Sequence, residues 1–466
     1  MNILVAIANY GDKNMAFLNT IIREYQSMPY HVDIVVMSNI PKTLGPGVEV
    51  KVGLPTKDPW SLPFGHKKLF AERSKEYDLF IYSEDDTLIR ENNIRAFMDV
   101  THILPEQEIA GFVRYEVDTS GNKYYSTVHS HFHWVPDSAK AIGGYTFARF
   151  TNDHSACYLL TQKQLKKAID SGGFLVAPHS ERYDLLVTAA TDPYTQCGFS
   201  KVICISRLQD FEIHHMPDVY IGKLGLSDSE FQRQIEALLK HAADAGHEGT
   251  LFPTATRLKQ ERWSKSYYEK NRGDITALIP RHAVEVLSVG CGWGATEEAL
   301  VHKGHKVVAI PLDAIIGASA QAKGVEVTCP DFERAYDELS GRSFDCMVFS
   351  DVLQYLHDPV KILSRYADLL TEEGFMVISV PNFQHIMVRR QLASEGISSG
   401  DANAFDRLGI HLTSKGMLQK WMKQSNLKVD RLIPGFRGRG EKLAPVTPGI
   451  LRKLIASHYI VVARRS

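Results

Sequence analysis

The chain has 466 residues, of which 44% are hydrophobic and 23% are charged, and its 53 Lys and Arg nearly balance its 54 Asp and Glu. This length suggests two or three domains with cores of their own, and a formal net charge of -1 argues against a general nucleic-acid-binding protein. Because the sequence has no apolar run of membrane-spanning length and no CxxC pair, we expect a cytoplasmic protein without a transmembrane segment, disulfide framework or zinc ribbon.

Residues 1–222 begin with alternating strand and helix signals. Short apolar runs at Ile3–Ala8, Val32–Met37 and Leu79–Tyr82 predict buried strands, and the apolar spacing within Met15–Ser27 predicts a helix. Strands that alternate with helices indicate an α/β sheet. Further along this segment the pattern becomes irregular, with many aromatic residues and histidines.

An acidic cluster directly follows the third of these strands. Glu84, Asp85 and Asp86 are adjacent there, and ligands of α/β sheets bind at the carboxyl ends of strands. Because neighbouring carboxylates repel one another unless a cation or hydrogen-bond donors satisfy them, the cluster predicts a site for Mg²⁺ or Mn²⁺ that neutralises a diphosphate. A solvated acidic loop or the start of a helix is the alternative interpretation.

With these features, residues 1–222 resemble glycosyltransferases of the GT-A type, in which an Asp-x-Asp-like motif holds a metal ion and a nucleotide-sugar. The resemblance implies contacts to the nucleotide-sugar from the loop after the first strand, a basic helix and the acidic cluster, namely Ala8, Asn9, Tyr10, Lys67, Glu84, Asp85 and Asp86. The metal ligands that it implies are Asp85, Asp86 and one or both of His214 and His215.

Two further groups in this segment are candidates for chemistry. His129, His131 and His133 alternate, so that on a strand they share one face roughly 6.6 Å apart; they form a candidate metal site, with aromatic packing as the alternative. Glu181 and Asp184 are candidates for the carboxylate that deprotonates a sugar acceptor. A plain ion pair of either with the neighbouring Arg182 is the alternative.

Residues 223–262 are expected to be a helical connector. Ser227–Ala245 has a helical pattern with Phe231, Ile235 and Leu238 on one face, and Gly246–Thr254 breaks that pattern. The α/β rhythm restarts in the third segment, 263–466. Its predicted strands are Val284–Val289, Lys306–Ile310, Phe344–Phe349, Phe375–Val380, Leu427–Ile433 and His458–Val462.

The first strand of this third segment runs into a glycine-rich turn. Gly290, Cys291, Gly292 and Gly294 lie directly after the strand and before a helix that begins near Ala295. Glycines let a backbone approach a ligand closely, and a helix N-terminus offers N–H donors. A tight strand-to-helix turn without a ligand is the alternative.

In this context, residues 263–466 resemble the class I S-adenosylmethionine-dependent methyltransferases. The supporting motifs include Asp331-Phe332-Glu333 and the run Leu353–Pro359 after the strand at 344–349. The resemblance implies a seven-stranded sheet, the methionine part of the cofactor over Gly290–Gly294, and Asp331 or Phe332 near its adenine.

The segment departs from that family at two acidic positions. Ser288 and Pro311 stand where the family usually has acids, the second of which holds the ribose hydroxyls. Asp313 lies two residues beyond Pro311 and is a candidate for that ribose contact. For an oxygen acceptor that needs a base, His385 and His411 are the candidates, since imidazole titrates near neutral pH; a structural or surface role is the alternative for each.

The sequence therefore predicts two Rossmann-like α/β domains and a bifunctional transferase. The first domain would transfer a sugar from a nucleotide-diphosphate sugar, and the second would methylate, through an oxygen, a glycan or lipid-linked glycan of polysaccharide biosynthesis. Two single-activity alternatives remain: a glycosyltransferase with a methyltransferase-like scaffold, or a methyltransferase with a carbohydrate-binding first domain.

Overall fold

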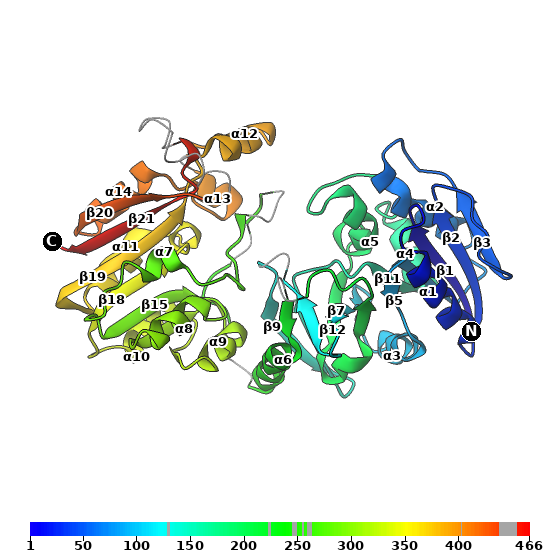
Figure 1. The fold of residues 1–466 in the computed structure, drawn as a ribbon, viewed down its shortest axis with the longest axis horizontal. Coiled ribbons are helices and arrows are strands. Elements are labelled where there is room, and N and C mark those ends of the chain that lie inside the picture. The colour runs from blue at the N-terminus through cyan, green and yellow to red at the C-terminus, as the bar shows by residue number, and fades with distance from the viewer. Residues whose placement is uncertain are drawn as a thin grey trace. The chain divides into compact units, whose positions relative to one another are not determined.

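The computed structural model describes residues 1–127, 131–221, 225–244, 249–253, 256–258, 263–401, 403–437 and 454–466. The chain forms two compact units, Met1–Ala245 and Gly246–Ser466, whose elements are labelled in Figure 1. The connector expected at 223–262 is not a separate segment, because its helix α6 (Asp228–Ala243) packs on strands of the first unit. Ser227 caps this helix by accepting a hydrogen bond from the amide of Glu230. Residues 259–262, at the end of the expected connector, lie outside the described residues.

The first unit is built around a mostly parallel sheet with the strand order β11-β4-β1-β2-β3. Its elements are β1 (Asn2–Asn9), α1 (Met15–Ser27), β2 (His31–Ser38), β3 (Val48–Val52), α2 (Gly65–Glu72), β4 (Leu79–Glu84) and the antiparallel β11 (Cys157–Thr161). Strand β1 is fully buried from Ile3 to Ile7, as expected of a central parallel strand. The order reverses at β1, which has β2 on one side and β4 on the other.

Two smaller sheets complete the first unit, with the orders β6-β12-β10-β9 and β14-β8-β7-β13-β5. Their strands are β5 (Thr87–Leu88), β6 (Glu108–Ala110), β7 (Val113–Val117), β8 (Lys123–Ser126), β9 (Trp134–Ile142), β10 (Tyr145–Phe150), β12 (Ser200–Cys204), β13 (Glu212–His215) and β14 (Gly225–Ser227). The remaining α-helices are α3 (Glu91–Thr101), α4 (Gln162–Asp170) and α5 (Leu185–Thr195). Antiparallel pairing of β13 with β5 sets His215 opposite Thr87, beside the acidic cluster.

The second unit contains the expected seven-stranded sheet, in the order β17-β16-β15-β18-β19-β21-β20, with only β21 antiparallel to its neighbours. Its strands are β15 (Glu285–Cys291), β16 (Lys306–Pro311), β17 (Glu326–Val327), β18 (Phe344–Ser350), β19 (Leu370–Pro381), β20 (Leu427–Gly435) and β21 (His458–Arg465). Its helices are α7 (Gly273–Thr276), α8 (Ala295–His302), α9 (Ala314–Gln321), α10 (Phe332–Glu338), α11 (Pro359–Ala367), α12 (Ile386–Ser394), α13 (Ala404–Leu408) and α14 (Lys415–Gln424).

The order of this sheet also reverses, at β15. Strands β16 and β17 lie to one side of β15, whereas β18 and β19 lie to the other. Since crossovers between parallel strands are right-handed, α8 and α9 cover one face and α11 covers the opposite face. The point of reversal, between β15 and β18, is where ligands of such sheets bind.

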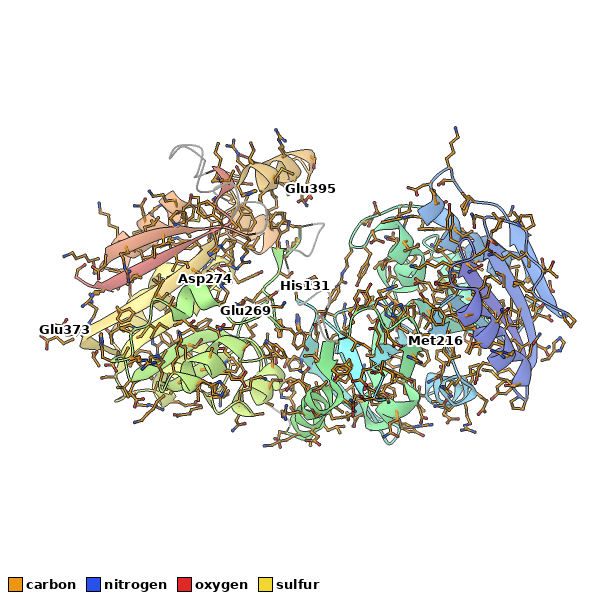
Figure 2. All side chains as sticks on the ribbon, in the orientation of Figure 1. His131, Met216, Glu269, Asp274, Glu373 and Glu395 are labelled. Carbon is orange, nitrogen blue, oxygen red and sulfur yellow. The ribbon has the colours of Figure 1, made fainter. Side chains whose placement is uncertain are left out.

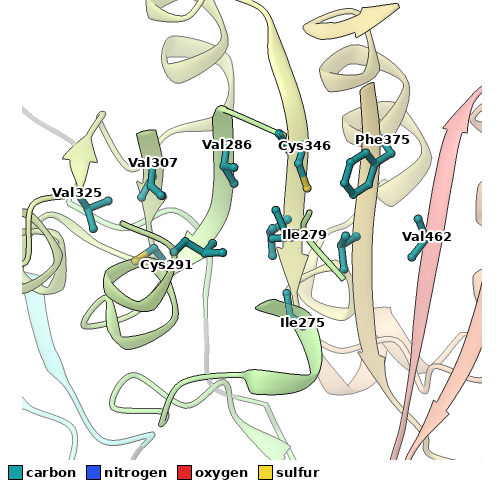
Figure 3. Packing of buried hydrophobic residues seen from close by; sticks show 14 of the residues in the cluster. Ile275, Ile279, Val286, Cys291, Val307, Val325, Cys346, Phe375 and Val462 are labelled. Atoms are coloured by element: carbon teal, nitrogen blue, oxygen red, sulfur yellow. The ribbon is translucent and has the colours of Figure 1, made fainter. Parts of the chain in front are cut away.

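One hydrophobic core of the second unit draws on most strands of the sheet. Figure 3 shows Val286, Val307, Cys346, Phe375 and Val462, which come from β15, β16, β18, β19 and β21. The α7 region supplies apolar side chains to the same core. Full burial of one such side chain contributes about 1.5–3 kcal/mol, so this core fixes the strand ends that carry the glycine turn.

Within the described parts of the chain, no helix combines the length and the apolar character needed to cross a membrane.

Candidate functional sites

A pocket of about 310 Å³ lies in the first unit at the carboxyl ends of β1 and β4. It is lined by Ala8, Tyr10, Asn14, Pro59, Trp60, Leu62, Pro63, Glu84, Asp85, Asp86 and Leu186. Because β1 and β4 are parallel and Ala8 pairs with Glu84, the residues that follow both strands emerge at the same edge of the sheet. The structure thus brings together five of the residues expected at a nucleotide-sugar.

Asp85 is held in place by two side-chain amides. Its Oδ2 accepts a hydrogen bond from Asn9 Nδ2 at 2.5 Å, and its Oδ1 accepts one from Asn14 Nδ2 at 2.8 Å. Asn9 therefore orients the acidic cluster and does not line the pocket. Burial raises the pKa of Asp85, and these two hydrogen bonds and Lys42 oppose that shift.

Glu84 is the most perturbed carboxyl group of the pocket. Burial, reinforced by the charge of Asp86, raises the pKa of Glu84 to about 8, so this group carries a proton at neutral pH. Its Oε1 is buried and accepts no hydrogen bond from any described residue. An unsatisfied buried oxygen costs roughly 1–3 kcal/mol, which favours a ligand donor or cation at this point.

Of the two predicted histidines, His215 reaches the acidic cluster and His214 does not. His215 Nε2 lies 3.6 Å from Asp86 Oδ2, and its Nδ1 lies 2.7 Å from Glu116 Oε1. The ring of His214 instead stacks on Tyr115 at 5.2 Å. The prediction of His214 as a metal ligand is therefore wrong, because neighbouring residues of a strand point to opposite faces.

A cation in this pocket would need ligands beyond the protein. The described residues contain no group of three or more His, Cys, Asp or Glu side chains arranged to hold a metal ion. The carboxylates of Asp85 and Asp86 do fit Mg²⁺ or Mn²⁺, since Mg²⁺ is commonly held by one or two carboxylates together with water and substrate phosphates. The donor set thus fits a metal that arrives with a diphosphate and not a preformed metal cage.

Lys67 does not face the pocket, contrary to the prediction. Its ammonium is paired with the buried carboxylate of Asp192 and lies 4.5 Å from the centre of the Phe64 ring. Lys67 lies on the buried face of helix α2, where burial lowers its pKa. Two other cations act on the acidic cluster: the charge of Arg114 opposes the raised pKa of Glu84, and that of Lys42, which hydrogen-bonds the carbonyl of Gly11, opposes the raised pKa of Asp85.

Of the two candidate carboxylates, Asp184 acts electrostatically on a residue of the pocket. Asp184 caps helix α5 through the amide of Val187 at 3.0 Å, and its charge contributes to the raised pKa of Glu84. Glu181 instead accepts a hydrogen bond from Gln196 at 3.2 Å.

The neighbouring Arg182 binds Asp153 at 3.0 Å and the carbonyl of Thr151 at 2.8 Å. These contacts join Arg182 to partners other than Glu181 and Asp184, with which an ion pair was considered as an alternative above.

Sequence reasoning missed an aromatic residue that lines the pocket. Trp60 lines this pocket and is 53% exposed, and Tyr10, which also lines it, is 52% exposed. Two exposed rings beside an acidic floor suit a flat base or the apolar face of a sugar. The only local signal for Trp60 was its position between prolines, in Pro59–Pro63.

The alternating histidines do not form the expected strand face. Strand β9 begins only at Trp134, and His133 Nδ1 lies 2.8 Å from the carbonyl of His131 in the preceding turn. His129 lies outside the described residues. The period-two argument for a metal site on a strand therefore fails for His131 and His133.

In the second unit, the glycine turn follows β15 as predicted. Gly290 has φ +78° and Gly294, the residue before α8, has φ +88°, a left-handed conformation that favours glycine. A Cβ atom on Gly290 would lie 2.3 Å from the Val352 side chain, and one on Gly292 would lie 2.4 Å from the Tyr267 carbonyl. Both the backbone conformation and the packing thus require glycine here.

A buried carboxyl group from α8 lies beside Ser288, where the resemblance led us to expect an acid. The Ser288 hydroxyl donates to Glu297 Oε1 at 2.6 Å, and both residues are buried. Glu297 lies in the first turn of α8, where the helix dipole stabilises a negative charge. Sequence reasoning missed this residue because the contact joins a strand to the helix that follows it.

The end of β16 lacks an acidic ribose contact in its usual place. Pro311 ends the strand, and Asp313 uses its Oδ1 to cap α9 through the amides of Ile315 and Ile316 at 2.8 and 2.7 Å. Asp313 Oδ1 is therefore already used as the N-cap of α9.

Asp331 likewise caps a helix, α10, through the amide of Arg334 at 2.6 Å. The neighbouring Phe332 accepts a hydrogen bond at its carbonyl from Tyr366 Oη at 2.8 Å. The backbone of Phe332 and the side chain of Asp331 are thus held in place at the start of α10.

A charged network lies at the carboxyl ends of β18 and β19. Asp351, at φ +52°, binds Arg272 at 2.7 Å and the Ser379 hydroxyl at 2.7 Å. Although burial opposes the shift, Arg272 lowers the pKa of Asp351. Glu269 and Asp274, both labelled in Figure 2, border this network. Burial raises the pKa of Glu269.

The two candidate bases differ in their hydrogen bonds. His385 accepts the Met387 amide at Nδ1, so its neutral ring carries the proton on Nε2. His411 Nε2 lies 3.0 Å from the Leu356 carbonyl, to which it donates, so Nδ1 is the acceptor of its neutral ring. Burial lowers the pKa of both, which keeps them neutral at pH 7.

Parts of this chain are similar to known proteins. The family model described as "Methionine biosynthesis protein MetW" matches residues 271–448. A ubiquinone biosynthesis O-methyltransferase of Paracidovorax citrulli is 31% identical over 116 residues, which are 24% of this chain and 49% of that protein. A trans-aconitate 2-methyltransferase of Deinococcus radiodurans is 30% identical over 139 residues, which are 29% of this chain and 54% of that protein.

Among solved structures, an S-adenosylmethionine-dependent methyltransferase from Mesorhizobium loti matches 41% of this chain and 96% of its own, at 15% identity and a TM-score of 0.30. The magnesium protoporphyrin IX methyltransferase of Synechocystis, solved with bound S-adenosylhomocysteine, matches 41% of this chain and 78% of its own, at 15% identity and a TM-score of 0.31.

The curated matches show that part of this chain is similar in sequence to methyltransferases. The chain spans about half the length of the two curated relatives named above, 49% and 54% respectively.

Proposed function

We propose that the second unit binds S-adenosylmethionine at Gly290–Gly294 and transfers its methyl group to an oxygen of an acceptor. The observation that carries this proposal is a glycine turn at the point where the strand order reverses, in a unit with sequence similarity to methyltransferases. Both curated relatives named above are methyltransferases, and the first is named as an O-methyltransferase.

When bound, S-adenosylmethionine supplies a methyl group on a sulfonium, a good leaving group, so the protein mainly has to position the reactants. The turn offers close backbone approach and the N-terminus of α8. Glu297, which accepts a hydrogen bond from Ser288, holds the start of α8 against β15. Asp331 and Phe332 are the proposed neighbours of the adenine, and Asp313 that of the ribose.

Of the two histidines, His411 is the better candidate for a base. Its neutral ring keeps Nδ1 as an acceptor, whereas the acceptor nitrogen of His385 is used by the Met387 amide. The lowered pKa of His411 keeps the ring unprotonated at neutral pH, as a base must be before it takes a proton.

We further propose that the first unit binds a nucleotide-diphosphate sugar and acts as a GT-A-like glycosyltransferase. The supporting observation is the pocket at the reversal point of the sheet, with an acidic cluster as its floor and Trp60 and Tyr10 among its lining residues. A divalent cation held by Asp85 and Asp86 would neutralise the diphosphate. Asp184 is the better-placed candidate for the base, because its charge acts on Glu84 within the pocket.

Together these proposals describe a cytoplasmic bifunctional enzyme that glycosylates and methylates a glycan or lipid-linked glycan of polysaccharide biosynthesis. The single-activity alternatives are a glycosyltransferase with a methyltransferase-like scaffold, favoured by Pro311, and a methyltransferase with a carbohydrate-binding first domain.

Calorimetry on the full chain separates the three readings. S-adenosylhomocysteine is titrated in one series, and UDP or GDP with Mn²⁺ in another. The bifunctional proposal expects both ligands to bind and expects hydrolysis of one nucleotide-sugar in a donor screen. Nucleotide binding alone favours the scaffold alternative, and cofactor binding alone favours the second. Binding of neither contradicts all three.

A further inference from the structure

A short segment of the chain lies across the carboxyl end of β16. Residues 249–252 pair antiparallel with the residues after that strand: the Leu251 amide donates to the Leu312 carbonyl at 2.9 Å, and the Ala314 amide donates to the Gly249 carbonyl at 2.8 Å. This places Thr250 opposite Asp313. We call residues 249–252 the plug segment.

An aromatic side chain of the plug segment packs where the base of the cofactor is proposed to lie. The ring of Phe252 is nearly parallel to that of Phe332, at 6.3 Å, and to that of Tyr355, at 5.4 Å. Phe252 is only 7% exposed. A flat apolar ring buried against these two rings occupies the kind of environment that an adenine base seeks.

Residues just beyond the plug segment also contact the second unit. The Thr256 hydroxyl and the Arg257 amide both donate to the carbonyl of Leu408, each at 2.9 Å, and Leu258 is buried. Residues 249–252 and residues 256–258 therefore both contact other elements of the second unit.

These contacts lie on the ribose side of the proposed cofactor site, where the usual acidic partner is missing. Pro311 offers no ribose acceptor there, and the carboxylate of Asp313 caps α9. A cofactor bound with its adenosine across the end of β16 needs the space and the backbone partners that the plug segment uses.

We propose that residues 249–252 form an internal plug of the adenosine side of the cofactor site, with Phe252 in the place of the base, and that cofactor binding displaces it. This inference rests on the proposed methyl-donor site. The affinity that is measured is then the intrinsic affinity reduced by the fraction of molecules in which the plug segment is open.

The test compares the binding of S-adenosylhomocysteine to the full chain and to two variants by calorimetry. Phe252→Ala removes the ring that fills the site, and Leu418→Ala is the control, because Leu418 is a fully buried apolar residue of α14 in the same unit that does not belong to residues 249–258. We expect Phe252→Ala to tighten binding by about fivefold or more, as for a plug closed in most molecules, while Leu418→Ala leaves the affinity near that of the wild type.

Hydrogen exchange supplies a second readout that does not depend on the variant. The amides of Leu251 and Ala314 donate the two hydrogen bonds of the plug, so both should exchange faster when S-adenosylhomocysteine is bound. Weaker or unchanged binding by Phe252→Ala, or greater protection of these amides with ligand, overturns the plug while leaving the methyl-donor site in place. Binding by none of the three proteins at millimolar ligand refutes the donor site and, with it, the plug.

Discussion

The replacement Gly290→Ala tests whether packing fixes the glycine turn. The new Cβ would lie 2.3 Å from Val352 Cγ1, in a backbone conformation of φ +78°. The left-handed conformation costs about 1–2 kcal/mol for a residue with a Cβ, and overpacking adds about 1–3 kcal/mol. We therefore expect the free energy of unfolding of the second unit to fall by about 2–5 kcal/mol.

Gly304→Ala is the matched control, because Gly304 has φ +95° and nothing lies within 4 Å of its added Cβ. It should cost only the conformational part, about 1–2 kcal/mol. Adding Val352→Ala to Gly290→Ala should recover much of the overpacking cost as a favourable coupling energy of about 1–3 kcal/mol.

Labelling of a buried thiol follows the second unit alone. Cys346 is fully buried in its core, so the fraction of Cys346 labelled by a pulse of thiol reagent across a urea series reports unfolding of that unit. If Gly290→Ala lowers the stability no more than Gly304→Ala does, the close approach of Val352 does not constrain the turn and this reasoning is wrong.

Three further predictions concern other groups. Asp86→Ala should abolish the Mn²⁺-dependent part of UDP or GDP binding while the first unit stays folded; equal affinity with Mn²⁺ and with EDTA would remove the metal from the account. Because burial lowers the pKa of His411, kcat/KM of methyl transfer should fall only below about pH 6.5, and a His411→Asn protein that keeps the wild-type rate would exclude this base. Lys67→Met leaves the buried Asp192 without its ammonium partner and should cost about 3–5 kcal/mol of stability in urea unfolding, most of it recovered by adding Asp192→Leu; full stability of the single variant would show that the pair matters little.

The fold was predictable where strands are buried along their length. The apolar runs of β1, β15 and β18 predict central parallel strands. The observed strands begin and end within one or two residues of their predicted bounds. The antiparallel strands of the first unit gave no such signal. Strand β9, for example, has mostly half-exposed residues without a clean alternation, so neither period stands out in its sequence.

The candidate sites were predictable where position along a strand decides them. Glu84–Asp86 and Gly290–Gly294 follow buried strands, and the ends of parallel strands necessarily meet at one edge of the sheet. The prediction that Lys67 faces a nucleotide-sugar failed because its partner, Asp192, is distant in sequence. A local basic run does not reveal which face of a helix is buried. Glu297 and Phe252 were missed for the same reason: each acts through a contact with another element.

The most direct test of the central claim is a titration of the full chain with S-adenosylhomocysteine, with Gly292→Val as the site control. The account predicts one saturable site per chain with a micromolar or weaker dissociation constant, about -8 kcal/mol or less favourable. Binding should be lost in the variant, because a Cβ at residue 292 would lie 2.4 Å from the Tyr267 carbonyl. Absence of binding at millimolar ligand, or equal binding by the folded Gly292→Val protein, would contradict a methyl-donor site at this turn.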